Sequence, residues 1–327
     1  MTHYFLEPVL ALCSDRSILA MDNPRMPGPD VWFSDNYIAQ FGLTGISFDF
    51  FINWISGGLD REVWLKRPIN PAAIHDWGLL QDQDIIRALR NDNKFRRLVN
   101  FAGKNFCTAS AIIFDDLQDW SHESAGLIYA HWPKDASSGQ GLRIRRITRA
   151  EIEETIRAKS GGAITIGNKG LFYGTSRLEC AMSKTNALWP GDADLVLCDN
   201  QSLEPIAILE FKKHTQNSKL YFANQCLSNY YPRPDGRKYD RLALLSHQLV
   251  PGKQIPVFAL YYSTDPTELS VLVEQVKGMA GSLQGAEITR IAIDPTKLAQ
   301  GLGALVSFIL SRAHQNTGGA PLAPLSN

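Results

Sequence analysis

Two apolar segments of the chain end in charged residues whose spacing suits metal chemistry. The first covers residues 191–199 and contains Asp194, and the second covers residues 205–213 and contains Glu210 and Lys212. A charged side chain at the end of a buried strand is unfavourable unless it is paired or binds a metal. Because side chains alternate along a strand, Glu210 and Lys212 share one face. A tight turn would pair the segments antiparallel and bring Asp194 close to Glu210.

Such a group of side chains predicts metal-assisted hydrolysis of phosphodiester bonds. Two neighbouring carboxylates repel each other, so they either raise one pKa or hold a cation between them. Oxygen ligands of this kind suit Mg²⁺ or Mn²⁺. A divalent ion would lower the pKa of an attacking water and neutralise charge on a phosphate. Lys212 would orient or polarise that water.

Hydrophobic periodicity and turn signals predict the elements that position these residues. We expect strands over residues 142–147, 171–182, 192–198, 206–212, 241–246, 257–262 and 288–293. We expect helices over residues 81–101, 148–159, 218–230, 269–279 and 297–312, the second of them opened by a capping box of Thr148 and Glu151. From residue 149 the order is α-β-β-β-α-β, which predicts an α/β fold with a mixed central sheet flanked by helices.

Asp194, followed after fifteen residues by Glu210-Phe211-Lys212, resembles the signature of the PD-(D/E)XK, or restriction-endonuclease-like, nuclease superfamily. The resemblance covers residues 149–262 and implies a restriction-endonuclease-like core. It implies that Asp194 and Glu210 ligate the metal, with the Phe211 carbonyl as a third ligand, and that Lys212 positions the water.

The resemblance also implies an acid from the preceding helix. Glu151, Glu153 and Glu154 compete for this role, and Glu154 is preferred because the capping box occupies Glu151. Asp192 is a rival to Asp194 as the first metal ligand. Asp194 is preferred because it directly precedes the apolar run of its strand.

Polar and aromatic residues that follow the second segment are candidates for substrate contact. Gln225 with Tyr230 is similar to a Gln that members often present after the E-x-K strand, although the spacing departs by one residue from the Gln-x-x-x-Tyr form. Basic residues interleaved with tyrosines suit phosphate contact and base stacking, and a solvated loop with packed tyrosines is the alternative. The candidate nucleic-acid contacts are Lys213, Lys219, Tyr230, Arg233, Arg237 and Lys238.

Composition shifts near residue 135, since six of the seven tryptophans precede it. We therefore expect an N-terminal α+β region over residues 1–135 with a recognition or accessory role. A nuclease-like domain is expected over residues 142–312 and a flexible tail over residues 313–327. The N-terminal region would also offer a surface for a homodimer.

The formal net charge is zero, because Lys+Arg and Asp+Glu both number 33, so phosphate contact requires a local basic patch. The five cysteines are widely spaced and odd in number, which favours free thiols in a reducing cytoplasm over a disulfide framework or a zinc site. No apolar run reaches the roughly 18 residues that span a bilayer, so no membrane partner is expected.

These observations predict a Mg²⁺-dependent nuclease that acts on DNA, in restriction, defence or repair. Two alternatives remain open at this stage. One is a nuclease with the same core that cleaves RNA. The other is a nucleic-acid-binding module that kept the fold and lost catalysis.

Overall fold

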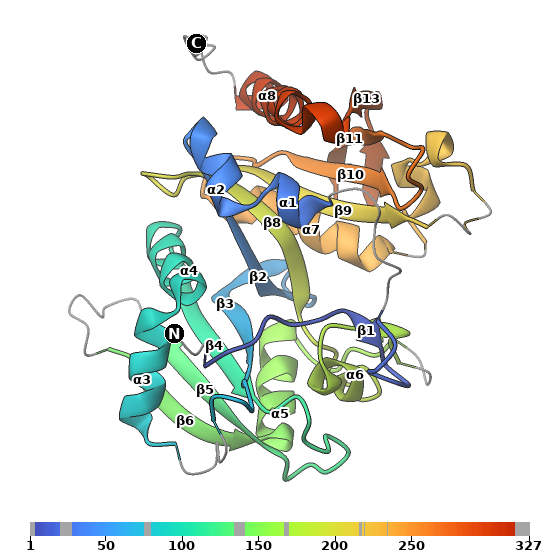
Figure 1. Cartoon of the computed structure of the whole chain (residues 1–327). Coiled ribbons are helices and arrows are strands. Elements are labelled where there is room, and N and C mark those ends of the chain that lie inside the picture. Colours follow the sequence, from blue (N-terminus) through green and yellow to red (C-terminus); the bar gives the residue numbers. More distant parts are fainter. Residues whose placement is uncertain are drawn as a thin grey trace. The chain divides into compact units, whose positions relative to one another are not determined.

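The computed structural model describes residues 4–19, 28–74, 80–133, 141–166, 170–215, 218, 220–233 and 235–317. The chain forms two compact units that alternate along the sequence (Figure 1). Unit 1 comprises residues 1–22 and 48–192, and unit 2 comprises residues 23–47 and 193–327. This division differs from the boundary expected near residue 135. Two strands, β2 (Leu43–Asn53) and β8 (Gly191–Asp199), cross from one unit to the other.

Unit 1 is built on a mixed sheet in the order β2-β3-β4-β5-β6, with β2 contributing its part from Phe48 onward. Only the β3–β4 pair of this sheet is parallel, among the pairings that the structure describes. The other strands of unit 1 are β3 (Gly58–Pro68), β4 (Thr108–Phe114), β5 (Gly126–Trp132), β6 (Arg143–Thr148) and the short antiparallel pair β1 (Ala11–Leu12) and β7 (Tyr173–Gly174).

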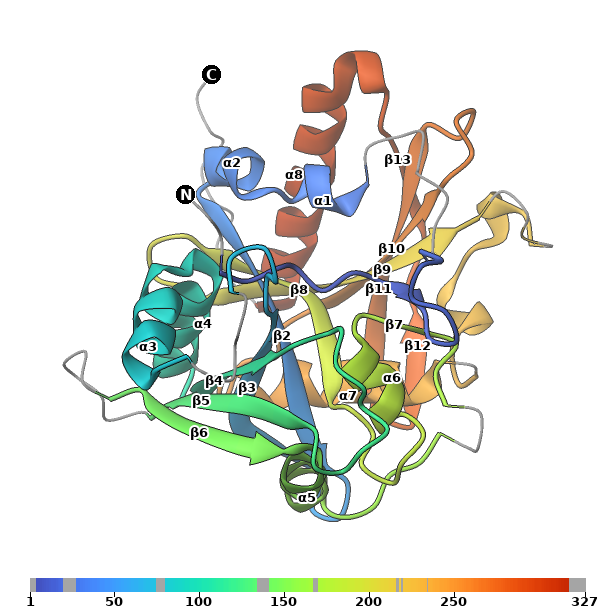
Figure 2. The ribbon, with the colours of Figure 1, turned by 60° about the horizontal axis from the view of Figure 1, so that its bottom comes forward.

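Helices cover both faces of the unit 1 sheet. Figures 1 and 2 show α3 and α4 on one side of β4 and β5 and α5 on the other. The helices are α3 (Asp82–Asn91), α4 (Asn93–Lys104), α5 (Arg149–Ser160) and α6 (Arg177–Met182). The aromatic residues Phe51, Trp64 and Trp189 pack between the sheet and α5 and α6, in a core that also takes Ile152 and Leu178.

A buried carboxylate, Glu62, ties β3 to the neighbouring elements of unit 1. It accepts hydrogen bonds from Trp64 Nε1 at 2.8 Å, from Ser110 Oγ and from the hydroxyl of Tyr129. Its other oxygen lies 2.8 Å from Lys159 Nζ. Burial alone would raise the pKa of Glu62, but the hydrogen bonds and the Lys159 charge outweigh burial and hold that pKa well below its usual range.

We expect Glu62→Gln to lower the free energy of unfolding at neutral pH by about 3 kcal/mol, because the Lys159 ammonium loses its buried partner and keeps only the more exposed Asp60. A carboxylate with a lowered pKa stabilises the fold above its unfolded pKa and loses that effect as the pH falls. The difference between the two proteins should therefore shrink as the pH drops below 4.5, the ordinary pKa of the group. Urea unfolding at several pH values measures this difference.

The exposed Asp84, which pairs with Arg87, provides the control, since Asp84→Asn should change stability by less than about 0.5 kcal/mol. Equal stability of Glu62→Gln and the wild type at pH 7 would contradict the assigned role of Glu62.

A disulfide joins Cys13 to Cys180 within unit 1. The expectation of free thiols is therefore wrong for these two cysteines, because folding brings two residues that are 167 positions apart to a Cα–Cα distance of 5.4 Å. The remaining cysteines, Cys107, Cys198 and Cys226, are not part of a disulfide. The disulfide removes one ground for the expected reducing cytoplasm, and the cytoplasmic location stays a prediction.

Alkylation of the denatured protein should label three thiols without a reductant and five after reduction, as counted by intact mass. Cys180→Ser should label four thiols under the first condition, because it frees Cys13. Five labelled thiols in the unreduced wild type would exclude the disulfide.

Unit 2 is built on strands in the order β12-β11-β10-β9-β8, with β13 also paired to β11. The residues 43–47 of β2 lie beside β8, where Ser47 Oγ donates to the Asp194 carbonyl. The β9–β10 pair is parallel, whereas β8–β9, β10–β11, β11–β12 and β11–β13 are antiparallel. The strands are β9 (Pro205–His214), β10 (Val257–Ser263), β11 (Ser270–Met279), β12 (Ser282–Gly285) and β13 (Thr289–Ala292).

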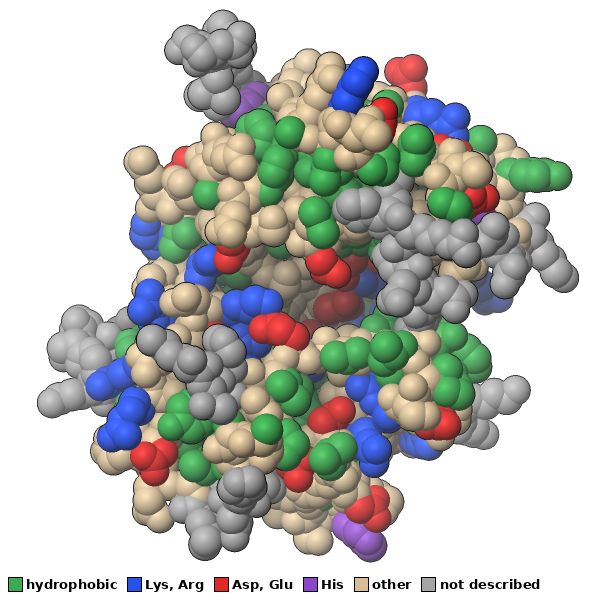
Figure 3. All heavy atoms as spheres, in the orientation of Figure 1, with side chains coloured by type: hydrophobic (Ala, Val, Ile, Leu, Met, Phe, Trp, Pro, Cys, Tyr) green, Lys and Arg blue, Asp and Glu red, His purple; other side chains and the backbone are tan. Residues whose placement is uncertain are grey.

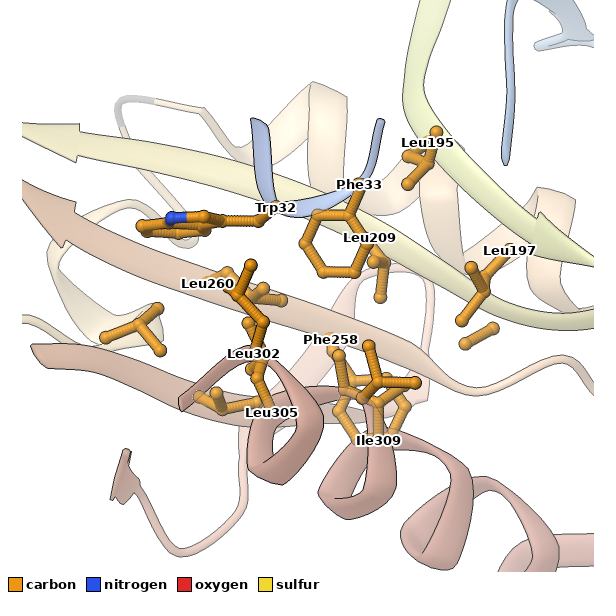
Figure 4. Close-up of a cluster of buried hydrophobic side chains, with 14 of the residues drawn as sticks. Trp32, Phe33, Leu195, Leu197, Leu209, Phe258, Leu260, Leu302, Leu305 and Ile309 are labelled. Carbon is orange, nitrogen blue, oxygen red and sulfur yellow. The ribbon is translucent and has the colours of Figure 1, made fainter. Parts of the chain in front are cut away.

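Alternation along these strands gives the unit 2 sheet one apolar face, whereas the other face mixes apolar residues such as Ile208 and Ala259 with the buried carboxylates Glu210 and Glu274. Phe211, Leu260 and Val273 follow one another across the sheet, and this face packs against α8, which supplies Leu305 and Ile309 (Figure 4). Trp32 and Phe33 complete this core. The helices of unit 2 are α1 (Pro29–Trp32), α2 (Asp35–Ile38), α7 (Gly236–Gln248), α8 (Leu298–Thr317) and the 3-10 turns η1 (Ala39–Phe41), η3 (Phe222–Asn224), η4 (Leu227–Asn229) and η5 (Pro295–Lys297).

The α/β class with a large mixed sheet flanked by helices is confirmed. The α-β-β-β-α-β order expected from residue 149 is wrong for those segments, because 171–182 forms β7 and α6. Ser176 caps α6 by accepting a hydrogen bond from the Glu179 N–H, which opens a helix within this segment. Along unit 2 alone, when the short helix α1 and the 3-10 turns are left aside, the elements α2, β2, β8, β9, α7 and β10 run in an α-β-β-β-α-β order.

Three further expected elements are wrong in type. Residues 218–230 hold two short 3-10 turns instead of a helix, and the Leu227 N–H bonds the Glu274 carboxylate. Residues 241–246 belong to helix α7, since a short apolar run fits either a buried strand or a buried helix. Residues 269–279 form strand β11, which is rich in β-branched residues and pairs with β10.

The expected helix over residues 81–101 is two helices, because Asp92 adopts an extended conformation and caps α4. The capping box of Thr148 and Glu151 is confirmed, as are the strands expected over 192–198 and 206–212. Lys219, the 134–140 part of the expected linker and the tail beyond residue 317 lie outside the described residues. Within the described part of the chain, no helix is both long and apolar enough to cross a membrane.

Candidate metal and phosphate site

The β8–β9 hairpin of unit 2 brings together the three residues expected to carry the chemistry. The antiparallel register places Leu195 opposite Leu209, so Asp194 and Glu210 are the next residues along the two strands. The Phe211 N–H donates to Asp194 Oδ2 at 2.8 Å, which holds the Asp194 carboxylate against β9. Lys212 Nζ lies 2.9 Å from Glu210 Oε1.

Helix α7 adds two residues to this group. Lys238 Nζ lies 3.1 Å from Asp194 Oδ1 and 3.0 Å from Glu210 Oε2. Asp235, directly before α7, accepts a hydrogen bond from Lys212 Nζ at 2.5 Å. Asp194, Glu210 and Asp235 therefore alternate with the two lysines, and we call these five residues the carboxylate–lysine cluster. Three carboxylates face two amines, which leaves one net negative charge.

Glu210 is the most deeply buried member of the cluster, with a relative exposure of 0%. Both of its oxygens lie within ion-pair distance of an amine, yet among the described residues neither accepts a hydrogen bond of good geometry. A buried carboxylate in this state is expected to gain from an additional cation. The Asp194 side chain is about 20% exposed, so its edge of the cluster is open to solvent.

Lys212 remains charged in this environment. Burial disfavours its ammonium form, but Glu210 and Asp235 outweigh burial and raise the pKa of Lys212 above its usual range. The rings of Tyr230 and Tyr239 lie 5.1 Å and 5.3 Å from Lys212 Nζ and add cation–π attraction. A permanently protonated amine donates hydrogen bonds and positive charge, and it does not act as a base.

Gln225 and Tyr230 lie behind Lys212. The Tyr230 hydroxyl donates to Gln225 Oε1 at 2.6 Å, and the Gln225 side chain is buried. This hydrogen bond fixes the ring that contacts Lys212. Burial raises the pKa of Tyr230, so its hydroxyl stays protonated near neutral pH. The ring of Tyr230 thus connects Gln225 to Lys212 of the cluster.

Glu154 belongs to unit 1 and not to the unit that holds the cluster. Its exposed carboxylate on α5 pairs with Arg157 at 3.0 Å. Of its two rivals, Glu151 caps α5 and Glu153 pairs with Arg149 at 2.9 Å. Each of the three acids therefore has a partner on its own helix or at its start.

The choice of Asp194 over Asp192 agrees with the geometry. Asp192 lies in unit 1, where its charge acts on the pKa values of Asp49 and Lys66. Asp194 is the residue of the pair that contacts β9 and Lys238.

The candidate nucleic-acid contacts separate into three groups. Lys238 is a member of the cluster, and the ring of Tyr230 contacts its Lys212. Arg233 and Arg237 are exposed at the start of α7. Lys213 lies on the opposite face of the sheet from Lys212, over the ring of Tyr262 at 5.9 Å, because successive strand residues alternate.

Sequence reasoning missed Asp235, and it placed Lys238 among substrate contacts only. Asp235-Gly236 directly precedes α7, and an Asp before a helix is a recognised N-terminal signal. The signal was lost because residues 241–246 were expected to form a strand, so no helix start was sought there.

The donor set of the cluster fits a magnesium-like ion. Mg²⁺ in proteins is commonly held by one or two carboxylates together with waters and substrate phosphates. Asp194 and Glu210 supply two carboxylates, and the backbone of Phe211 lies beside them. Among the described residues, no group of three or more His, Cys, Asp or Glu side chains is arranged to hold a metal, so the remaining ligands would come from backbone, water and phosphate.

Comparisons with protein-family models, with curated proteins and with solved structures found no match to this chain. The resemblance to PD-(D/E)XK nucleases therefore rests on the residues of the β8–β9 hairpin and their geometry.

Saturating Mg²⁺ or Mn²⁺ should raise the melting temperature of the wild type by roughly 5 °C, since a ligand at about one hundred times its Kd stabilises by about 2.7 kcal/mol. Glu210→Gln should abolish this shift because it removes a charged ligand. Glu274→Gln is the matched control, since Glu274 is a second buried glutamate and lies in the same row of the sheet as Glu210. Scanning calorimetry checks all three proteins, and equal shifts in all of them would argue against a cation at Glu210.

Proposed function

We propose that the chain is a metal-dependent nuclease that hydrolyses phosphodiester bonds, with DNA as the favoured substrate. The observation that carries the proposal is that Asp194, Glu210 and Lys212 meet on one face of a buried antiparallel hairpin. The α-β-β-β-α-β order along unit 2 supports a restriction-endonuclease-like core. The net negative charge of the cluster supports a divalent cation, Mg²⁺ or Mn²⁺, as cofactor.

In this mechanism Asp194 and Glu210 would hold the cation, and the Phe211 carbonyl is the proposed third protein ligand. When bound, the cation would lower the pKa of an attacking water and neutralise charge on the phosphate. Lys212 donates a hydrogen bond that orients the water for in-line attack, and its charge stabilises the developing negative charge. Tyr230 and Asp235 fix the position of the Lys212 amine.

Basic side chains elsewhere suit a nucleic-acid partner. Arg233 and Arg237 are exposed near the cluster in unit 2. Figure 3 shows Lys and Arg side chains on the side of unit 1 where α3 lies, and Arg87 and Arg90 are exposed on that helix. With zero net charge overall, such local groups supply the attraction to phosphate. A homodimer that cuts both strands of a duplex stays a prediction.

A specific observation also favours a second candidate, a nucleic-acid-binding module without catalysis. The two lysines already pair with all three carboxylates of the cluster, so the cluster is a plausible ion-pair network in its own right. Such a network would hold β8, β9 and α7 together and need no metal.

Purified full-length protein should cleave DNA in the presence of Mg²⁺ or Mn²⁺, and chelation by EDTA should stop cleavage. Asp194→Asn, Glu210→Gln and Lys212→Met should each lower the rate at least about 100-fold, since each removes a charge that acts on the transition state. Glu274→Gln should keep the wild-type rate within about threefold.

Single-stranded DNA, duplex DNA and RNA of one sequence are compared in the same assay. If only RNA is cleaved, RNA replaces DNA as the proposed substrate. Binding without cleavage of any of the three, with either metal, would favour the non-catalytic module and reject the nuclease.

A further inference from the structure

Lys238 occupies the space between the two candidate metal ligands. Its amine lies 3.1 Å from Asp194 Oδ1 and 3.0 Å from Glu210 Oε2, so one ammonium bridges a carboxylate of β8 and a carboxylate of β9. The residue stands near the start of α7, and its side chain is about 27% exposed. It is thus held at the cluster and also has access to solvent.

A divalent cation and the Lys238 amine cannot occupy this position together. An ion held by both carboxylates would use an oxygen of each. The Lys238 amine already contacts an oxygen of each carboxylate, so the ion and the amine would compete for the same place. Two positive charges so close together repel strongly in a partly buried site. Metal binding therefore requires the amine to leave.

We propose that Lys238 is a built-in counter-ion of the empty cluster, that a divalent cation displaces its amine, and that the displaced amine then binds the substrate phosphate. The proposal rests on the nuclease function above and adds a role for a residue outside the Asp194, Glu210 and Lys212 signature. The flexible four-carbon stem of lysine allows this movement without displacement of α7.

The net charge of the metal-bound site favours a phosphate as the new partner of the displaced amine. Without metal the cluster carries one net negative charge, and a divalent cation would make it one net positive charge. A phosphodiester brings one negative charge to the same place. The exposed Arg237 on the same turn of α7 adds to the positive surface that the phosphate would meet. Lys238 is accordingly a substrate-binding residue whose contacts change with the occupancy of the site.

The proposal predicts that removal of the amine strengthens metal binding. When a ligand must displace an internal competitor, its apparent Kd is its intrinsic Kd divided by the fraction of time that the competitor is absent. We expect Lys238→Met to lower the Kd for Mn²⁺ about tenfold, which corresponds to an amine that is docked about nine-tenths of the time. Binding is measured on the full chain without nucleic acid, by the loss of the free Mn²⁺ signal in electron paramagnetic resonance.

Lys253→Met is the matched control. Lys253 is a lysine of unit 2 that pairs with the exposed Glu204 at 2.6 Å. The Lys253→Met substitution should leave the Kd for Mn²⁺ and the cleavage rate unchanged. At saturating Mn²⁺, Lys238→Met should cleave at least about tenfold more slowly than the wild type, because the phosphate loses a contact. A purely structural role of Lys238 predicts the opposite for the metal, namely weaker Mn²⁺ binding together with slower cleavage.

Circular dichroism confirms the fold of each variant, and Lys238→Gln replaces Lys238→Met if the latter does not fold. An unchanged or higher Kd for Mn²⁺ in the variant, with clear binding by the wild type, overturns the role of Lys238 and leaves the nuclease proposal standing. Absence of Mn²⁺ binding by the wild type and the variant alike overturns both.

Discussion

The burial of one carboxylate, that of Glu210, constrains the arrangement around the β8–β9 hairpin. A buried carboxylate must be compensated by hydrogen bonds or by positive charge, and among the described residues Glu210 accepts no hydrogen bond of good geometry. Lys212, from the same strand, supplies one charge, and Lys238, from α7, supplies the other. These contacts tie α7 to β8 and β9. The α8 face is filled with leucine, valine and phenylalanine, whereas the face with Glu210 combines this ion-paired group with buried apolar residues such as Ile208 and Ala259.

Three residues of the candidate site were predictable because they lie close together in the sequence. Asp194, Glu210 and Lys212 belong to one hairpin, and strand alternation with a tight turn is enough to bring them together. Lys238 and Asp235 reach the cluster through a crossover helix, and their contacts depend on how that helix packs. Sequence periodicity gave this region the wrong type of element, so the position of the two residues could not be inferred.

The fold was predictable in class and less so in detail, for two physical reasons. A short apolar run such as residues 241–246 satisfies both a buried strand and a buried helix, and only its packing partners decide. Residues 269–279 show the converse, since their pairing with β10 overrides a helical pattern. The alternation of the two units along the chain could not be predicted either. Nothing in the sequence of residues 28–47 indicates that they belong with the segment beyond residue 192.

The order in which the chain leaves the ribosome gives that alternation a further consequence. Residues 43–47 emerge early, but β8, the strand beside them in unit 2, follows only after all of residues 48–192 have been made. Until then this segment lacks its strand partner and exposes unpaired backbone groups, as an unprotected sheet edge does. Unit 1 is continuous from residue 48 to residue 192 and can begin to fold in the interval. Completion of unit 2 is therefore a late event in biosynthesis that depends on long-range contacts, the step at which aggregation or chaperone binding is most expected.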